Sequence, residues 1–519
     1  MHLLSWTALD LVVLATIVHL IRRFLDHRRR RGLQYVPGPK GLPVIGNLLD
    51  VSAKEGLWLT YDRLGKSYGD MYSLEVLGQR ILVLQTHKAV ADLFEKRGQR
   101  YSDRIIPTML EMAGYSKWFL SLLHPDASWR LGRRTLDRAL RPSALVQYQP
   151  VQRRKALDFC QQLLHEPADF VNHIKHLGGA VIMALAYGYD VESSNDKLLK
   201  SGHTAVDVVA VSLLPGALLV NILPSLRHIP KWVPGLSYKP MAKYAFDVGQ
   251  TSIYGPWNFV KNEMAKGTAR PSVARDELSE QQFKTEEEEH TIVGALGTMF
   301  AAGSDTTTSV LETLFLMLCL YPEVQSRAQA ELESVTKGER LPTFADRTEL
   351  HYINALCREL TRWRIVTPIG VPHATSEDDI YEGYFVPKGT LVVANALTIL
   401  QDPAVYPEPH VFRPERYMTE EGCFKDDPWL SIAFGGGKRI CPGRFIVDNT
   451  VFITVSLVLS VFNVSKPKGT PHGLLEGNEN VGDSIVTRPQ PFACSIVPRS
   501  KSAVDILLAT VSESSESDI

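Results

Sequence analysis

The residues best suited to carry out chemistry lie in one short segment, numbers 434–443, which reads Phe-Gly-Gly-Gly-Lys-Arg-Ile-Cys-Pro-Gly. Three consecutive glycines let the backbone fold tightly before Cys441, and Pro442 follows it, so the thiol is held at a bend. Lys438 and Arg439 stand just before the cysteine, and nearby positive charge stabilises a thiolate. A thiolate fixed on a rigid loop can act as a nucleophile, a redox sulfur or a metal ligand.

The interpretations of this segment differ in the partner that each requires. A phosphate-binding loop does not fit, because the glycine spacing is wrong and Lys438 is followed by arginine rather than serine or threonine. A cysteine hydrolase needs a histidine base, and none of the 15 histidines lies near Cys441 in sequence, although a distant one can meet it in space. A thiolate on a haem iron needs one cysteine only, because the porphyrin supplies four ligands. A buried structural cysteine also remains open.

A second set of polar residues falls in the middle of the longest predicted helix. Thr285 and Glu288 make an S/T-x-x-E capping box at its start, and Pro322 supplies the stop. Residues 291–320 are apolar enough for a membrane span, but the polar run 304–309 lies at their centre, where polar groups are costly in lipid. We therefore expect a buried helix that crosses a large soluble domain.

Small and polar side chains share the centre of that helix. Residues 301–303, Ala-Ala-Gly, would allow a flat or bulky group to lie close to the helix. Asp305 and Thr306 would then place a carboxyl and a hydroxyl group beside it. A helix with a polar stripe and one packing glycine explains the same residues, so this segment alone does not decide between the two.

The rest of the chain must form the body that positions these groups. Its 519 residues carry a net charge of -1, which leaves no basic field for nucleic acid. Its six cysteines form no C-x-x-C pair, which argues against zinc knuckles and disulfide frameworks and makes a reducing compartment the default. Helical patterns dominate, with strand-like stretches at 71–77 and 81–84, and again at 384–386 and 390–393. We expect one catalytic unit, residues 47–500, that is mainly α with small β-sheets.

The two ends of the chain differ from this body. Residues 1–31 hold an apolar run, 3–21, followed by arginines, an order typical of a membrane anchor that leaves the body in the cytosol rather than of a signal peptide. Asp10 makes the run a weak span, so a tilted or interfacial helix stays open. Residues 32–46 form a stiff, proline-rich hinge. The acidic, serine-rich tail, 501–519, has little to bury and is expected to be disordered.

Five motifs, taken together, resemble those of the cytochrome P-450 monooxygenases. The cysteine segment fills every fixed position of the family's haem-binding loop, F-x-x-G-x-R-x-C-x-G. The other four resemble the oxygen-activating helix, the E-x-x-R pair, the arginine loop that binds this pair and the helix that meets a haem propionate, at residues 302–307, 359–362, 414–416 and 129–133. The match extends over nearly the whole chain. The sequence pattern is also similar to that of fungal microsomal members of secondary metabolism.

This resemblance implies a fold and a cofactor site. The fold would be the helix-rich triangular prism of the family, with haem b between the long helix and the cysteine loop and an N-terminal anchor helix in front. The residues that would bind the cofactor are Cys441 as the axial ligand of the iron, Trp129, Arg133, His373 and Arg439 at the haem propionates, and Phe434 of the loop.

The resemblance also implies roles in chemistry and stability. Asp305 and Thr306 would deliver protons to bound dioxygen, whose second oxygen leaves as water. Glu359, Arg362 and Arg416 would form a buried charge triad behind the haem. A surface pair of Glu359 and Arg362, three residues apart on a helix, is the ordinary alternative.

Electrons must come from another protein, because too few residues follow Gly443 for a flavin or nicotinamide domain. The resemblance implies an NADPH–cytochrome P-450 reductase, with cytochrome b5 as a further donor, so that NADPH and flavins act only through a partner. The reductase would dock on the positive face near Lys438 and Arg444 of an enzyme anchored in the endoplasmic reticulum membrane.

The stretches that would face the substrate, by the same resemblance, are mostly apolar and favour a lipophilic molecule held by shape. The first expectation is hydroxylation of a fungal terpenoid of sesquiterpene type, with a polyketide, an indole or other aromatic compound, or a xenobiotic as alternatives. A haem-binding isomerase or sensor is the non-oxygenase alternative. These stretches are residues 101–118, 206–223, 300–302, 366–371 and 481–485.

Overall fold

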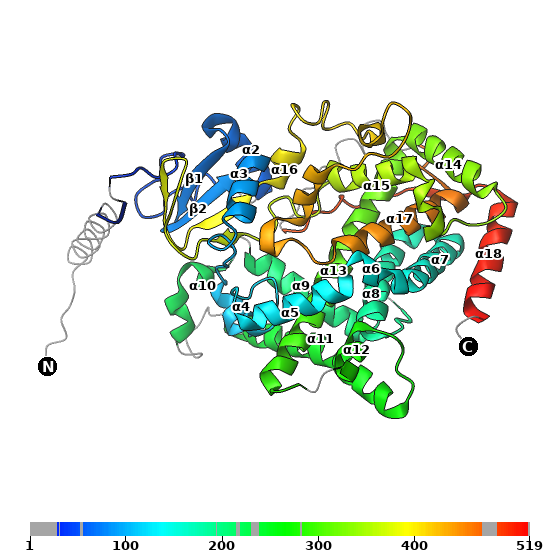
Figure 1. Ribbon diagram of the computed structural model, residues 1–519, viewed down its shortest axis with the longest axis horizontal. Coiled ribbons are helices and arrows are strands. Elements are labelled where there is room, and N and C mark those ends of the chain that lie inside the picture. The colour runs from blue at the N-terminus through cyan, green and yellow to red at the C-terminus, as the bar shows by residue number, and fades with distance from the viewer. Residues whose placement is uncertain are drawn as a thin grey trace.

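The computed structural model of this protein describes residues 28–30, 32–51, 56–193, 195–213, 218–229, 238–280, 283–469 and 485–516. Helices predominate in this part of the chain, and the largest sheet lies at one side of the molecule (Figure 1). The α-helices are α2 (Leu57–Tyr68), α3 (His87–Val90), α4 (Thr108–Met112), α5 (Ala127–Leu140), α6 (Pro142–Leu145), α7 (Gln149–His165), α8 (Phe170–Tyr187), α9 (Lys197–Leu213), α10 (Leu219–Ile222), α11 (Tyr238–Lys266), α12 (Val273–Glu280), α13 (Glu286–Leu320), α14 (Pro322–Thr336), α15 (His351–Trp363), α16 (Ala396–Leu400), α17 (Arg444–Val461) and α18 (Lys501–Glu516).

The described strands form one four-stranded sheet and two two-stranded sheets, β4 with β5 and β7 with β8. In the larger sheet the order is β1-β2-β6-β3, with β2 and β6 parallel and the other neighbours antiparallel. The predicted pair at 71–77 and 81–84 is present as β1 and β2, which are joined by a tight turn with positive φ at Leu77 and Gly78. The strands are β1 (Met71–Val76), β2 (Gln79–Leu84), β3 (His373–Ala374), β4 (Asp379–Tyr381), β5 (Tyr384–Val386), β6 (Leu391–Ala394), β7 (Phe462–Ser465) and β8 (Ser495–Pro498).

The two later strand-like stretches, at 384–386 and 390–393, both form strands, but these strands belong to different sheets. β5 pairs with β4 across a turn at Glu382 and Gly383, whereas β6 pairs with β2. Pro387, between β5 and β6, has no N–H to offer a ladder, and its carbonyl oxygen accepts hydrogen bonds from the hydroxyls of Thr375 and Thr390, both at 2.7 Å. The alternation of residues therefore indicated strands without indicating their partners.

The long central helix, α13, begins and ends where its capping residues predict. The Thr285 side chain accepts a hydrogen bond from the backbone N–H of Glu288 at 3.1 Å, while the Glu288 carboxylate accepts from the N–H of Lys284 rather than closing the box at Thr285. After Leu320 the chain bends by 105° into α14, which starts at Pro322. Most side chains of α13 are buried, because α5, α8, α9 and α11 pack around it (Figure 1). The polar centre of this helix predicted a buried helix that crosses the domain, and the structure confirms this prediction.

Two helical regions in the described part of the chain are long and apolar enough to span a bilayer by composition. One is α17, and the other is the bent pair of α13 and α14 taken together. Most of α17 is buried inside the protein, which is typical of a core helix rather than a membrane span. The predicted anchor at residues 3–21 lies outside the described residues.

The C-terminal tail was expected to be disordered, and for most of its length this prediction is wrong. Residues 501–516 form α18, which packs against α7 and α17 at one end of the molecule (Figure 1). Leu507 is fully buried, and Ile506 and Val511 pack on the same core. These apolar residues recur at helical spacing, so the serine-rich composition of the last residues concealed an amphipathic helix.

If the docking of α18 is part of the fold, Leu507→Ala should destabilise the protein and Leu508→Ala should not. Leu507 has no exposed surface and Leu508 is 39% exposed. Removal of a buried leucine side chain costs about 2–5 kcal/mol, whereas an exposed one usually costs about 0.5 kcal/mol or less. Urea-unfolding midpoints of the two variants would measure the difference. Equal midpoints would show that α18 is not docked in solution.

Candidate functional site

The segment that carries Cys441 is a tight loop between two short helical turns and α17. Gly437 has a positive φ of 58°, and a Cβ atom there would lie 1.9 Å from the carbonyl oxygen of Phe94, so this position accepts only glycine. The backbone N–H of Cys441 donates to the carbonyl of Phe434 at 2.8 Å, which closes the loop. α17 then begins at Arg444. The glycine run thus lets the loop press against the neighbouring backbone and fixes the cysteine before a helix.

The thiol of Cys441 is in surroundings that disfavour its charge. Burial raises the pKa of this thiol above the usual value, and the backbone N–H groups of Gly443 and Arg444 and the charges of Arg133 and Arg444 offset burial only in part. The sequence assigned this stabilising role to Lys438 and Arg439, but Lys438 is exposed and the Arg439 guanidinium bonds elsewhere. A metal cation at the sulfur would favour the thiolate far more strongly than these groups do.

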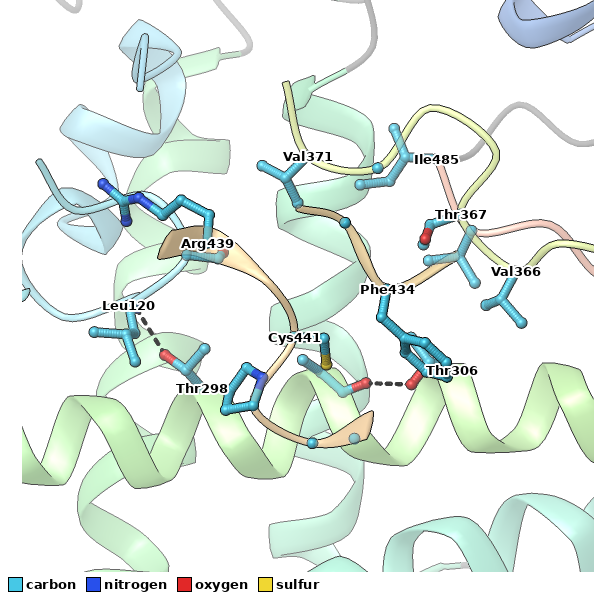
Figure 2. Close-up of a pocket in the computed structure, with 18 of the residues that line it drawn as sticks. Leu120, Thr298, Thr306, Val366, Thr367, Val371, Phe434, Arg439, Cys441 and Ile485 are labelled. Carbon is cyan, nitrogen blue, oxygen red and sulfur yellow. Dashed lines mark hydrogen bonds between the residues drawn. The ribbon is translucent and has the colours of Figure 1, made fainter. Parts of the chain in front are cut away.

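Cys441 opens onto a cavity of about 340 Å³ that is lined mostly by apolar side chains (Figure 2). The opposite wall is α13, on which Ala302, Gly303 and Thr306 line the cavity. Ala302 is exposed although it lies in the middle of a buried helix, because no part of the chain that the structure describes covers it. The helix therefore presents a face of small side chains across the cavity from the cysteine loop. Such a space accepts a flat group against the helix, as the residues 301–303 predicted, although Ala301 itself does not line the cavity.

A buried arginine at one edge of the cavity has an unused donor. Arg439 donates to the carbonyl oxygens of Ser102 and Leu123 at 2.8 and 2.7 Å, and its guanidinium lies 4.3 Å from the centre of the Trp129 ring. Its Nη1 atom is buried and has no hydrogen-bond partner among the residues that the structure describes. A buried N–H of a charged group left without an acceptor costs free energy. The cavity edge thus offers a place for an anionic acceptor.

Two further basic residues stand at the same edge. Arg104 is buried and its guanidinium donates to the carbonyl oxygens of Val371 and Pro372, both at 2.6 Å. His373 stacks on Phe94 with ring centres 3.8 Å apart, and its Nδ1 donates to the carbonyl of Tyr101 at 2.7 Å.

This cluster of bases is short of negative charge. Burial, followed by the charge of Arg439, lowers the pKa of Arg104, and burial together with Arg104 lowers the pKa of His373. Bound carboxylates would offset the mutual repulsion of these cations. They would also offer an acceptor to the Nε2 of His373 and to the orphan donor of Arg439.

Arg133 lines the cavity but already uses several of its donors. Its Nη1 donates to the carbonyl of Ile440 at 2.6 Å and its Nε pairs with Asp137 at 2.8 Å. Arg444 similarly donates to the carbonyl of Cys441 at 2.8 Å. In this structure both arginines therefore hold the backbone of the cysteine loop.

The residues at this cavity fit a haem. The sulfur of Cys441, the small side chains of α13 and the buried bases surround one space, which suits a planar cofactor with a metal at its centre and carboxylates at its edge. Phe434, Trp129, Arg133, His373 and Arg439, which the sequence assigned to the cofactor, all line this cavity with Cys441. Arg104 was not assigned to it, because the sequence placed it among substrate-facing residues and only the fold brings it beside Arg439.

The charge triad lies behind the cysteine loop and not at the cavity. The carboxylate of Glu359 pairs with both Nε and Nη2 of Arg362 at 2.7 Å, and Arg416 approaches it at 3.3 Å. The backbone N–H of Arg413 adds a further hydrogen bond at 2.9 Å. Glu359 and Arg362 have no exposed surface, so the surface-pair alternative is excluded.

Asp305 does not line the cavity, in contrast to its neighbour Thr306. The carboxylate of Asp305 forms an ion pair with Arg488, which approaches from the C-terminal part of the chain. The Thr306 hydroxyl lines the cavity and donates to the carbonyl of Ala302 at 3.0 Å (Figure 2). The two residues are adjacent on α13, but their side chains point to different surroundings.

Each of the five predicted substrate-facing stretches contributes at least one residue to the cavity wall. From 101–118 only Arg104 does so, and the adjoining residues Phe119, Leu120 and Ser121 take the place expected for that stretch. Residues 481–484 lie outside the described part, and Ile485 lines the cavity. The other contributors from these stretches are Val206, Val209, Ala210, Leu213, Ala302, Val366, Thr367, Ile369, Gly370 and Val371.

Comparison with known proteins agrees with this geometry. A family model described as Cytochrome P450 matches residues 36–495. The chain is 39% identical over 481 residues to the cytochrome P450 monooxygenase COX2 of Coprinopsis cinerea, which covers 91% of this chain and 90% of that protein. It is 37% identical over 512 residues to cytochrome P450 monooxygenase 208 of Postia placenta, covering 97% and 98% of the two chains. It is also 37% identical over 499 residues to the cytochrome P450 monooxygenase ple1 of Rhodocybe pseudopiperita, covering 94% of each.

If the buried bases bind carboxylates of the cofactor, Arg104→Gln should weaken haem retention. A hydrogen bond to a charged group contributes about 1.5–3 kcal/mol, so haem should dissociate roughly ten- to a hundredfold faster. The transfer of haem to apomyoglobin, followed by absorbance, measures this rate. Arg130→Gln is the matched control, because Arg130 is an exposed arginine that does not line the cavity. Equal rates in the two variants would exclude the role of Arg104.

Proposed function

The chain belongs to the cytochrome P450 family, and from this membership we propose that its cavity binds haem through Cys441 and oxidises a lipophilic small molecule. Family membership makes the protein a monooxygenase, an oxidoreductase with a haem-thiolate iron, and sets aside a cysteine hydrolase. The observation that carries the assignment of residues is that Cys441 and Thr306 line one cavity from two different elements.

Residues of this chain would bind the cofactor at two places, the metal and the propionates. Cys441 would supply the sulfur ligand, and Arg439, Arg104 and His373 would bind the propionates. When bound, the haem iron supplies the dioxygen chemistry, in which one oxygen atom enters the substrate and the other leaves as water with two electrons from NADPH. The loop keeps the sulfur at a fixed position, because hydrogen bonds from Arg133 and Arg444 hold the carbonyl groups on either side of it.

Thr306 would accept and pass on protons on the cavity side of α13. Its hydroxyl donates to Ala302 in the helix, and this bond keeps the oxygen at the cavity wall with its lone pairs available. A proton arriving from outside can be accepted and passed on at this oxygen. The apolar side chains around it exclude bulk water, so protons enter only by such a polar group.

The cavity wall supports a largely hydrocarbon substrate, and we propose a terpenoid of sesquiterpene type. Most of the hydroxyls on the wall are occupied within the protein, since Thr298 bonds Gly294 and Leu120, and Thr361 bonds Cys357. The Thr367 side chain lines the cavity, and its hydroxyl could bind one polar group of a substrate or product. A polyketide or aromatic substrate would require more polar contacts than this wall offers.

We further propose that a separate NADPH-dependent reductase supplies the electrons and that the enzyme sits on the endoplasmic reticulum membrane. Lys438, exposed on the outer side of the cysteine loop, supports docking of an acidic partner there. Residues 3–21 support the anchor by their composition alone.

The ligand assignment predicts that Cys441→Ser abolishes the red-shifted Soret band of the reduced protein under carbon monoxide, because only a thiolate ligand produces that shift. Cys423→Ser, at an exposed cysteine away from the cavity, should retain the band. Optical spectra of both variants provide the measurement. A band that survives in Cys441→Ser would transfer the ligand role to another residue.

The substrate assignment predicts that microsomes containing this chain and a reductase add one oxygen atom to a sesquiterpene hydrocarbon. The apolar wall should bind such a compound by shape, and mass spectrometry of extracts with and without NADPH would detect the gain of one oxygen. Polyketides and indoles tested in parallel serve as competitors. Oxidation of a polyketide or an indole alone would contradict the terpenoid proposal while leaving the monooxygenase assignment intact.

A further inference from the structure

The loop before α5, residues 118–123, forms a part of the cavity wall that the sequence did not predict. Phe119, Leu120 and Ser121 line the cavity, whereas little of the predicted stretch 101–118 does. The loop is neither helix nor strand, yet all its residues except Ser121 are buried. Its backbone N–H and carbonyl groups therefore need hydrogen-bond partners inside the protein. Those partners show what holds this part of the wall in place.

Three helices approach this loop, each with a glycine at the point of contact. A Cβ atom at Gly294 of α13 would lie 2.7 Å from the backbone carbonyl oxygen of Trp118. At Gly132 of α5 it would lie 3.0 Å from the Leu120 side chain, and at Gly249 of α11 it would lie 3.3 Å from the Trp118 ring. The contact at Gly294 is too close for any larger side chain, because the atom that it meets belongs to the backbone.

One side chain of α13, Thr298, supplies the acceptor that the centre of the loop needs. The backbone N–H of Leu120 donates to the Thr298 hydroxyl at 2.9 Å (Figure 2), and this hydroxyl donates to the carbonyl of Gly294 at 2.8 Å. Thr298 is buried, although it lies at the cavity wall. A valine of the same shape would leave the buried N–H of Leu120 without this acceptor.

The far end of the loop is held by two of the buried arginines at the cofactor edge of the cavity. Nε of Arg104 donates to the carbonyl of Ser121 at 3.0 Å, and Nη2 of Arg439 donates to the carbonyl of Leu123 at 2.7 Å. The loop is thus fastened to α13 at its centre and to the proposed propionate site at its end. Its position relative to the cofactor site is therefore set by hydrogen bonds within the protein.

Thr298 belongs to the stripe of α13 that faces the cysteine loop across the cavity. Gly294, Thr298, Ala302 and Thr306 follow one another at intervals of four residues, so each is the neighbour of the next on the helix surface. Thr298, Ala302 and Thr306 all line the cavity. At 1.5 Å per residue, Thr298 lies about 6 Å along the helix axis from Ala302. One rigid helix therefore positions both the loop and the cofactor side of the cavity.

We propose that Thr298 is a positioning residue that determines which carbon of a lipophilic substrate is oxidised, because its hydroxyl seats Phe119 and Leu120 at the cavity wall. This inference rests on the proposed oxidation of a lipophilic molecule in this cavity. A substrate with few polar groups is oriented by shape, so displacement of one wall presents a different carbon to the reaction centre. The reaction itself is unchanged, since one oxygen atom still enters one C–H bond.

The first experiment compares the products that the reconstituted holoenzyme forms from one sesquiterpene hydrocarbon. Thr298→Val should lower the ratio of the main singly oxidised isomer to the others several-fold, because the loop moves when Leu120 loses its acceptor. Thr298→Ser keeps the hydroxyl and should retain most of the wild-type ratio. Thr313→Val is the matched control, since the buried Thr313 hydroxyl donates within α13 to Ser309 at 2.9 Å and does not line the cavity. Gas chromatography with mass spectrometry measures the ratio.

A second variant moves the same loop and keeps the hydroxyl. In Gly294→Ala the added methyl group meets the Trp118 carbonyl, so the loop must shift, although alanine itself favours a helix. The product ratio should therefore fall as it does in Thr298→Val. If Thr298→Val fails to bind haem, Gly294→Ala decides whether the position of the loop sets the ratio. A wild-type ratio in Gly294→Ala would overturn the proposed link between the loop and the site of oxidation.

The second experiment needs no turnover and no terpenoid. Imidazoles that bind a haem iron shift the Soret band, so an absorbance titration of the holoenzyme gives their affinity. Clotrimazole is bulky enough to reach the wall, whereas 1-methylimidazole is too small. Thr298→Val should weaken the binding of clotrimazole several-fold and leave that of 1-methylimidazole unchanged. Thr298→Ser and Thr313→Val should leave both affinities unchanged.

The outcomes separate this inference from the proposal on which it rests. If the wild-type holoenzyme shows the red-shifted band under carbon monoxide but does not oxidise the sesquiterpene, the substrate proposal fails and the titrations decide the role of Thr298. An unchanged product ratio in Thr298→Val, or an equal change in Thr313→Val, would overturn that role. Equal losses of affinity for the two imidazoles would also overturn it, because they would indicate damage at the haem rather than a displaced wall.

Discussion

The proposed ligand role of Cys441 requires a sulfur atom to carry negative charge inside an apolar cavity, and this requirement explains how the protein is built around it. Burial raises the pKa of the Cys441 thiol, and the surrounding N–H groups and arginines compensate only partly. The protein therefore fixes the backbone of the cysteine loop and leaves the final compensation to a bound cation. Gly437 against Phe94, and the hydrogen bonds from Arg133 and Arg444, serve that rigidity. If the cysteine loop moved, the sulfur would lose its contact with the bound cation and, with it, the compensation of its negative charge.

Two groups of buried charges differ in how fully the protein supplies their opposite charges and hydrogen-bond partners. Around Glu359, carboxylate oxygens and guanidinium donors satisfy one another, so this triad is a finished structural unit. Around Arg439 and Arg104, guanidinium groups face carbonyl oxygens and each other, and one buried donor has no acceptor within the described part of the chain. Incomplete clusters of this kind are costly unless a ligand completes them. The contrast separates a set of residues that stabilises the fold from a set that we propose binds the cofactor.

The local parts of this architecture could be predicted from the sequence, because their signals lie within a few residues. The limits of α13 follow from Thr285 and Pro322, and the cysteine loop follows from its glycines. Contacts between distant segments could not be predicted in the same way. Nothing near Arg104 indicates that it meets Arg439, and nothing near Asp305 indicates Arg488. The tail was misjudged for a related reason, since composition averages over residues and hides the helical spacing around Leu507.

The parallel pairing of β2 with β6 has a consequence for the order in which the protein can fold. Ile81 and Leu391 are partners in this sheet, although most of the polypeptide is synthesised between them. The β1–β2 hairpin therefore leaves the ribosome with one edge unpaired and must wait until β6 emerges. During synthesis, this exposed edge is a place where nascent chains can associate wrongly, and chaperones would be needed to shield it. Complete burial of the sheet becomes possible only late in translation, shortly before the haem-binding loop itself appears.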